Sequence, residues 1–279
     1  MKRRLLYFVY VDGTSPYDEG FHGSMAEYNF INLKRYADRF DSATFILSTA
    51  PSIDNIDRVL ADYTSYIMSI GFDMDVEFIT EPNTQLREAD AFHRHFVMDM
   101  DRYDGDLVFF GHTKGTTNNA NESLMKWICA MYYFSLEDID MVTDWMVSKR
   151  KAFYGFPLID ASDSSYHPFE VRPKHKYYYY GTMYWTNPGL LKAYMADDWH
   201  KGEIPELFDR YYAEWFPAQC LPMRFAGTFG DVSTLNGIDL YNNFDILLGD
   251  FEAGLKGDSP VPAFMEHYKS IMDEFNSQA

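Results

Sequence analysis

The sequence is short of cysteine and of long apolar runs. Cys129 and Cys220 are the only cysteines in 279 residues, which excludes a disulfide framework and is typical of a reducing compartment. The apolar run at residues 5–11 stops at Asp12 without a small-residue cleavage site. No stretch approaches the ~18 consecutive apolar residues of a membrane span. These absences predict a cytoplasmic protein with no transmembrane segment.

Positive charge is also scarce. Lysine and arginine number 24 against 42 aspartate and glutamate residues, so the formal net charge is −18. A surface with that average field repels phosphate backbones, which argues against nucleic acid as a partner. An anionic ligand would therefore need a local group of cations, such as those at residues 149–151 or 172–176.

Apolar runs alternate with helical patterns through the first 110 residues. Strands are expected at residues 5–11, 43–48, 76–80 and 107–110, and helices are expected after Ser24, from about Ile53 and from about Arg87. Strands that alternate with helices in this way are joined by right-handed crossovers. The sequence therefore predicts an α/β, Rossmann-like fold with a mostly parallel central sheet flanked by helices.

The fourth expected strand leads into the main candidate site. Residues 107–110 have no polar member, which is typical of a central strand buried on both faces. Gly111, His112, Thr113, Lys114 and Gly115 follow it, and ligands of open α/β sheets gather at such carboxyl ends. A cation, an imidazole and a hydroxyl offer donors to an oxyanion, with phosphate favoured. The alternative is an ordinary surface loop whose polar side chains are only solvated.

Two Asp-x-Asp pairs have the form of metal motifs. Asp73 with Asp75, and Asp99 with Asp101, both precede their strands, so they belong at the amino edge of the sheet, away from the ligand edge. His93 and His95 stand two apart in an expected helix and point to different sides. No metal ligand is assigned from these residues.

Several short motifs share their order and spacing with a known family. They are His112-Thr113-Lys114 after the buried strand, Trp127 in the next helix, Tyr154-Gly155, and Gly181-Thr182-Met183-Tyr184-Trp185. Together they resemble glycosyltransferases of the rhamnan synthesis protein F type, which serve bacterial polysaccharide assembly. The likeness covers roughly residues 106–191. It departs from the family at Tyr184, where the family has Phe, and at Gly115, where a second basic residue is expected.

The resemblance implies one GT-A domain over residues 1–279 that transfers a sugar from a nucleotide-diphosphate sugar to a hydroxyl of a glycan acceptor. Residues 1–117 would form the nucleotide-binding half, 118–235 the acceptor and sugar half, and 236–279 a C-terminal helical extension. The tripeptide His112-Thr113-Lys114 stands where many GT-A enzymes carry a metal-binding Asp-x-Asp, so a divalent metal stays optional. This assignment requires the tripeptide to emerge at the open rim of the sheet.

Roles follow for individual residues as expectations. His112 and Lys114 would stabilise charge on the leaving diphosphate, and Glu214, Asp231 or Asp160 would take the acceptor proton. The expected donor-binding residues are Asp12, Asn83, Arg87, Glu88, Thr113 and Arg172, with Lys174 beside the last. The expected acceptor and sugar residues are Gly181, Thr182, Tyr184 and Trp185, although a buried aromatic pair is an equal reading of the last two.

Two other functions remain open at this point. One is a glycan- or nucleotide-binding protein that keeps the fold without turnover. The other is a phosphate-ester hydrolase, which would need a carboxylate-bound metal. The sequence leaves the donor's base and sugar, the acceptor, the anomeric outcome and the oligomeric state undetermined.

Overall fold

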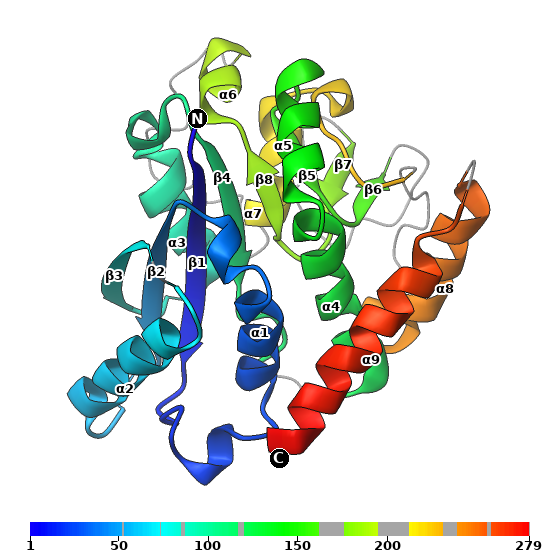
Figure 1. Ribbon diagram of the computed structural model, residues 1–279. Coiled ribbons are helices and arrows are strands. Elements are labelled where there is room, and N and C mark those ends of the chain that lie inside the picture. Colours follow the sequence, from blue (N-terminus) through cyan, green and yellow to red (C-terminus); the bar gives the residue numbers. More distant parts are fainter. Residues whose placement is uncertain are drawn as a thin grey trace.

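The computed structural model contains a six-stranded sheet with helices on both faces (Figure 1). It describes residues 1–51, 53–72, 74–84, 87–116, 120–161, 176–194, 212–230, 239–255 and 258–278. The strands of this sheet are β1 (Arg3–Val11), β2 (Ser42–Thr49), β3 (Asp75–Pro82), β4 (Leu107–His112), β5 (Phe153–Gly155) and β8 (Tyr184–Thr186). Strands β6 (Leu158–Asp160) and β7 (Tyr177–Tyr179) form a separate antiparallel pair.

The order of the large sheet is β3-β2-β1-β4-β8-β5. Strands β1 to β4 are mutually parallel, and β8 runs antiparallel to both of its neighbours. The four strands expected in the first 110 residues are all present, so the predicted α/β fold with a mostly parallel sheet is confirmed. The order 3-2-1-4 reverses direction between β1 and β4, and ligands of doubly wound sheets bind outside the carboxyl ends of the strands at such a reversal.

Helices divide between the two faces of the sheet (Figure 1). One face carries α1 (Met25–Lys34), α2 (Ile56–Ser69), α4 (Glu122–Leu136), α5 (Ile139–Ser148), α8 (Leu240–Gly254) and α9 (Val261–Gln278). The other carries α3 (Glu88–Phe92) with the π-helical turn His93–Val97, α6 (Pro188–Tyr194) and α7 (Tyr212–Cys220). Leu107 and Phe109 enter the first core and Val108 and Phe110 the second, because side chains alternate along a strand.

The end of the chain is helical where the structure describes it. Helix α8 packs on α4, and α9 packs on α1 and α4 with Phe264 and Ile271 fully buried. Both expected internal boundaries, at 117/118 and 235/236, lie outside the described residues, so the division into halves stays a prediction. Among the described helices, none has the length and apolar character to cross a bilayer.

Candidate functional site

The tripeptide His112-Thr113-Lys114 lies at the carboxyl end of β4, beside β1. His112 pairs with Phe8 in the parallel ladder, the backbone N–H of Thr113 donates to the Phe8 carbonyl (3.0 Å), and the hydroxyl of Thr113 accepts from the backbone N–H of Tyr10 (3.0 Å). The position at the carboxyl end of a central strand agrees with the sequence prediction. The prediction that the tripeptide emerges at an open rim is wrong, because His112, Thr113 and Lys114 are only 5, 4 and 8% exposed.

Lys114 is enclosed between helices on opposite faces of the sheet. Its Nζ lies 3.8 Å from Glu214 Oε1 on α7 and 4.8 Å from the ring centroid of Trp127 on α4. The ammonium therefore meets a carboxylate on one side and the face of an indole on the other, both of which attract a cation. The exposed fractions of the Lys114 and Glu214 side chains are 9 and 5%.

Glu214 carries the most perturbed carboxyl of the site. Burial raises its pKa to about 7, against the attraction of Lys114, and the charge of Glu88 adds to the rise. The backbone N–H of Gly181 donates to Oε1 (3.2 Å), and the Thr182 hydroxyl also binds the carboxylate. A carboxyl that changes protonation near neutral pH has the property that a general base needs.

The structure places two of the three candidate bases. Glu214 lies at the tripeptide, whereas Asp160 lies on β6, in register with Tyr177 of the small sheet. Asp231 lies outside the described residues, as do Arg172 and Lys174. Their expected roles stay predictions.

His112 does not supply positive charge. Its Nε2 donates to the Gly181 carbonyl (2.9 Å), and burial lowers its pKa to about 4, with Lys114 lowering it and Glu88 raising it. The imidazole is therefore neutral at neutral pH. The expectation that His112 shares a cationic role with Lys114 is corrected, and within the tripeptide the positive charge belongs to Lys114.

Gly181 and Thr182 join the site through the turn between β7 and β8. The Gly181 peptide binds Glu214 through its N–H and His112 through its carbonyl. Gly181 has φ +114° and Thr182 has φ +60°, a left-handed conformation that costs a β-branched residue energy. A Cβ on Gly181 would collide with Met131 Sδ and lie 3.1 Å from Trp127 Cζ2. The turn is therefore fitted closely between the helices that enclose Lys114.

Tyr184 and Trp185 are core residues. Both are fully buried; the Tyr184 hydroxyl donates to the Ala213 carbonyl (2.6 Å) and Trp185 Nε1 donates to the Ser135 carbonyl (2.9 Å). Trp185 stacks on Phe40 at a centroid distance of 5.8 Å. Stacking on a sugar needs an open ring face, which neither side chain has here, so β8 contributes a buried aromatic pair instead.

The expected donor residues that the structure describes follow the carboxyl ends of β1 and β3. Asp12 is exposed directly after β1, where its Oδ1 accepts from the backbone N–H of Thr14 (2.8 Å). Arg87 is exposed with φ 52°, and the half-buried Glu88 begins α3 close enough for its charge to act on both His112 and Glu214. Asp12 thus follows β1 directly, and Glu88 reaches the site electrostatically from the start of α3.

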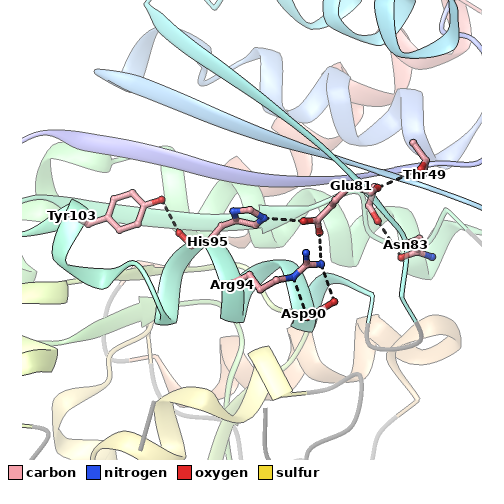
Figure 2. Close-up of polar contacts among 8 residues, drawn as sticks. Thr49, Glu81, Asn83, Asp90, Arg94, His95 and Tyr103 are labelled. Carbon is pink, nitrogen blue, oxygen red and sulfur yellow. Dashed lines mark hydrogen bonds and ion pairs between the residues drawn. The ribbon is translucent and has the colours of Figure 1, made fainter. Parts of the chain in front are cut away.

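Asn83 belongs to a polar cluster at the ends of β2 and β3 (Figure 2). Its Oδ1 accepts from the Ser48 hydroxyl (3.2 Å). The nearby carboxylate of Glu81, 7% exposed, contacts His95 Nε2 (2.9 Å) and Arg94 Nη2 (3.2 Å). These contacts connect the π-helical turn His93–Val97 to β3, the edge strand of the sheet.

The rejected metal motifs lie where the topology places them. Asp75 is the first residue of β3, and Asp101 pairs with Lys192 (3.0 Å) before β4 begins. His93 contacts Tyr212 (3.3 Å) while His95 contacts Glu81, so the two imidazoles face different partners. Within the described parts of the chain, no group of three or more His, Cys, Asp or Glu residues is arranged to hold a metal ion.

One residue of the site was not singled out from the sequence. Asn29 lies on α1, and its side-chain amide binds both the N–H and the carbonyl of Lys114. The available signal was a polar residue in the middle of a helix in which every residue from Met25 to Leu33 is buried.

The chain is an α/β protein with a polar site at the carboxyl edge of a mostly parallel sheet. The strand order sets the switch point, and the Lys114–Glu214 pair lies there. No protein-family model and no curated protein sequence matches the chain, so the likeness to rhamnan synthesis protein F stays a prediction.

Among solved structures, the chain is similar to 4-diphosphocytidyl-2C-methyl-D-erythritol synthase from Anaerococcus prevotii DSM 20548. The identity is 10%, over 88% of this chain and 95% of that chain, with a TM-score of 0.39. A second 4-diphosphocytidyl-2C-methyl-D-erythritol synthase matches at 12% identity, over 89% of this chain and 98% of that one, also with a TM-score of 0.39. Because both TM-scores lie below 0.5, the fold and the site rest on this chain's own geometry.

Proposed function

We propose that this protein is a glycosyltransferase that uses a nucleotide-diphosphate sugar as donor and a hydroxyl of a glycan as acceptor. The observation that carries the proposal is the Lys114–Glu214 pair at the carboxyl end of β4. It unites a fixed cation with a carboxyl whose pKa is raised to about 7. An inverting sugar transfer uses both groups, one for the leaving phosphate and one for the acceptor proton.

In the proposed reaction the bond between the anomeric carbon and the diphosphate oxygen breaks, and a bond to the acceptor oxygen forms. Negative charge develops on the departing diphosphate, which the Lys114 ammonium stabilises. The acceptor proton passes to the Glu214 carboxylate. The Gly181 peptide binds both neutral His112 and Glu214, so His112 and Gly181 together orient the Glu214 carboxylate.

The burial of Lys114 does not meet the condition taken from the sequence, that the tripeptide emerge at an open rim, so the proposal rests on the Lys114–Glu214 pair instead. Because only 9% of the Lys114 side chain is exposed, the donor phosphate has to reach an ammonium that already contacts Glu214 and Trp127. Asp12 follows β1, Asn83 follows β3 and Glu88 begins α3, and in this proposal they contact the nucleoside of the donor.

A nucleotide screen tests the proposal. The full chain is heated with UDP, GDP or dTDP and with their sugar derivatives, since a ligand that binds the folded state raises the melting temperature. We expect one nucleotide family to raise it, and its sugar to release nucleoside diphosphate when a glycan acceptor is added. If no nucleotide raises the melting temperature, the proposal is wrong.

A matched pair of variants links turnover to the site. Lys114→Met should abolish release of nucleoside diphosphate. Lys126→Met removes another nearly buried lysine, which pairs with Glu122 of α4 and Asp245 of α8, and should leave turnover unchanged. A folded Lys114→Met protein with normal turnover would remove Lys114 from the mechanism.

The burial of the tripeptide favours a second candidate, a nucleotide- or glycan-binding protein without turnover. The same screen separates the two. Stabilisation by a nucleotide sugar without release of nucleoside diphosphate, across acceptors, identifies the binding protein.

A further inference from the structure

The backbone of Lys114 lies beyond the end of the sheet. The last ladder bond between β1 and β4 is the one from the Thr113 N–H to the Phe8 carbonyl. Lys114 comes next, and its N–H and carbonyl are buried polar groups that need other partners. The side chain of Asn29 supplies both, because Lys114 N donates to Oδ1 (3.2 Å) and Nδ2 donates to Lys114 O (2.8 Å). The Asn29 side-chain amide thus makes the two backbone hydrogen bonds that a residue of a neighbouring strand would make.

Asn29 itself is held on every side. Its Nδ2 also donates to the Met25 carbonyl (2.6 Å), and its Oδ1 also accepts from the Tyr132 hydroxyl (3.3 Å). The Tyr132 hydroxyl is in turn hydrogen bonded to Tyr7 of β1. An amide side chain has two donors and two acceptor positions, so its full capacity is used. The network joins α1, α4 and β1 to the one residue that carries the cation.

Asn32 offers a contrast within the same helix. It is also fully buried, but its side chain binds Tyr28 of its own helix, whose carbonyl accepts from Asn32 Nδ2 (2.8 Å). Its Oδ1 meets no hydrogen-bond donor among the described residues. The two asparagines thus match in burial and in helix, and they differ in that only Asn29 contacts Lys114.

We propose that Asn29 is a positioning residue that holds Lys114 against Glu214. Its catalytic consequence rests on the proposed function, but its effect on the Lys114–Glu214 pair does not. Loss of the Asn29 amide removes a hydrogen-bond partner from two buried backbone groups of Lys114, and the segment then moves to recover those bonds. The distance from the ammonium to the carboxylate grows, and the attraction that favours ionised Glu214 weakens.

The experiment measures the titration of Glu214 in the full chain without any substrate. Glutamate labelled with 13C at the carboxyl carbon gives a resonance that follows protonation, and Glu214→Gln identifies it by its loss. We expect Asn29→Ala to raise the midpoint by about one pH unit, as the weakening of a close charge pair does. Asn32→Ala removes an equal volume and should leave the midpoint unchanged.

An unchanged midpoint in a folded Asn29→Ala protein would overturn the inference. If Asn29→Ala does not fold, Asn29→Ser keeps a short polar side chain but cannot bind both groups of Lys114, and the same shift is expected of it. An unchanged midpoint in the serine variant counts against the proposal equally. A shifted midpoint in a protein that turns over no nucleotide sugar would support the positioning role and contradict the glycosyltransferase, so the two failures are distinct.

Discussion

Lys114 Nζ lies 3.8 Å from Glu214 Oε1, and the two side chains come from the segment after β4 and from α7, which are far apart in the chain. The carboxyl is buried, so water does little to stabilise its charge, and the ammonium opposes that penalty only in part. The result is a carboxyl with a pKa of about 7 next to a cation. This relationship decides the pH behaviour expected of the protein.

Turnover should depend on the ionisation of Glu214. As a base it must be deprotonated, so kcat/KM for the donor is expected to rise with pH through about 7 and then level off. Glu214→Gln should lower kcat by about 10²- to 10⁴-fold, the usual contribution of a general base. Steady-state rates between pH 5 and 9 check both outcomes, and a profile without inflection near 7 contradicts the role.

The stability of the fold should fall as pH rises through the same range. Unfolded glutamate loses its proton near pH 4.5 whereas folded Glu214 keeps it to about 7, so proton loss favours the unfolded chain between these values. A shift of that size corresponds to about 3 kcal/mol of unfolding free energy. Glu214→Gln should flatten this decline in urea titrations from pH 5 to 8. The exposed Glu122→Gln, as the control, should keep the wild-type slope.

His112 should act with the opposite sign. Its pKa is lowered from 6.5 to about 4 by burial, so between these values the unfolded chain binds a proton that the folded protein does not. The stability it contributes is complete above pH 6.5 and is lost as pH falls towards 4. His112→Gln keeps a donor for the Gly181 carbonyl and should reduce this acid loss. The control is His22→Gln, at a half-exposed histidine, which should not reduce the loss of stability in acid. Equal slopes for both variants would show that His112 does not carry the effect.

Gly181 should tolerate no side chain. Alanine there would adopt φ +114° and press its Cβ on Met131 and Trp127, so Gly181→Ala is expected to lose about 2 kcal/mol of unfolding free energy. Gly249 lies in α8 with open space around its Cα, and Gly249→Ala should gain up to about 1 kcal/mol from helix propensity. Thermal unfolding of the two variants beside the wild type tests the contrast. Similar melting temperatures would mean that the turn can rearrange.

Local patterns predicted a large part of the fold. Uniformly apolar runs such as residues 107–110 identified strands buried on both faces, and the helices between them required parallel pairing. Parallel strands end at one edge, which placed the tripeptide after β4 beside β1 and put Asp75 and Asp101 at the other edge. The same patterns failed at Tyr184 and Trp185, because alternation along β8 buries one residue in each core.

The sequence by itself determined the four parallel strands β1 to β4, the edge at which they end and the presence of a cation at that edge. Parallel pairing of these strands follows from the alternation of short strand and helix patterns, so neighbouring residues carry that information, whereas the antiparallel β8 did not follow from it. Only the tertiary structure decided that Lys114 is buried and that its ammonium lies beside Glu214. It also decided that His112 is neutral and that Asn29 binds the backbone of Lys114. Those properties depend on how α1, α4 and α7 pack around one strand end. Packing between distant elements sets burial and charge separation, which no local pattern specifies.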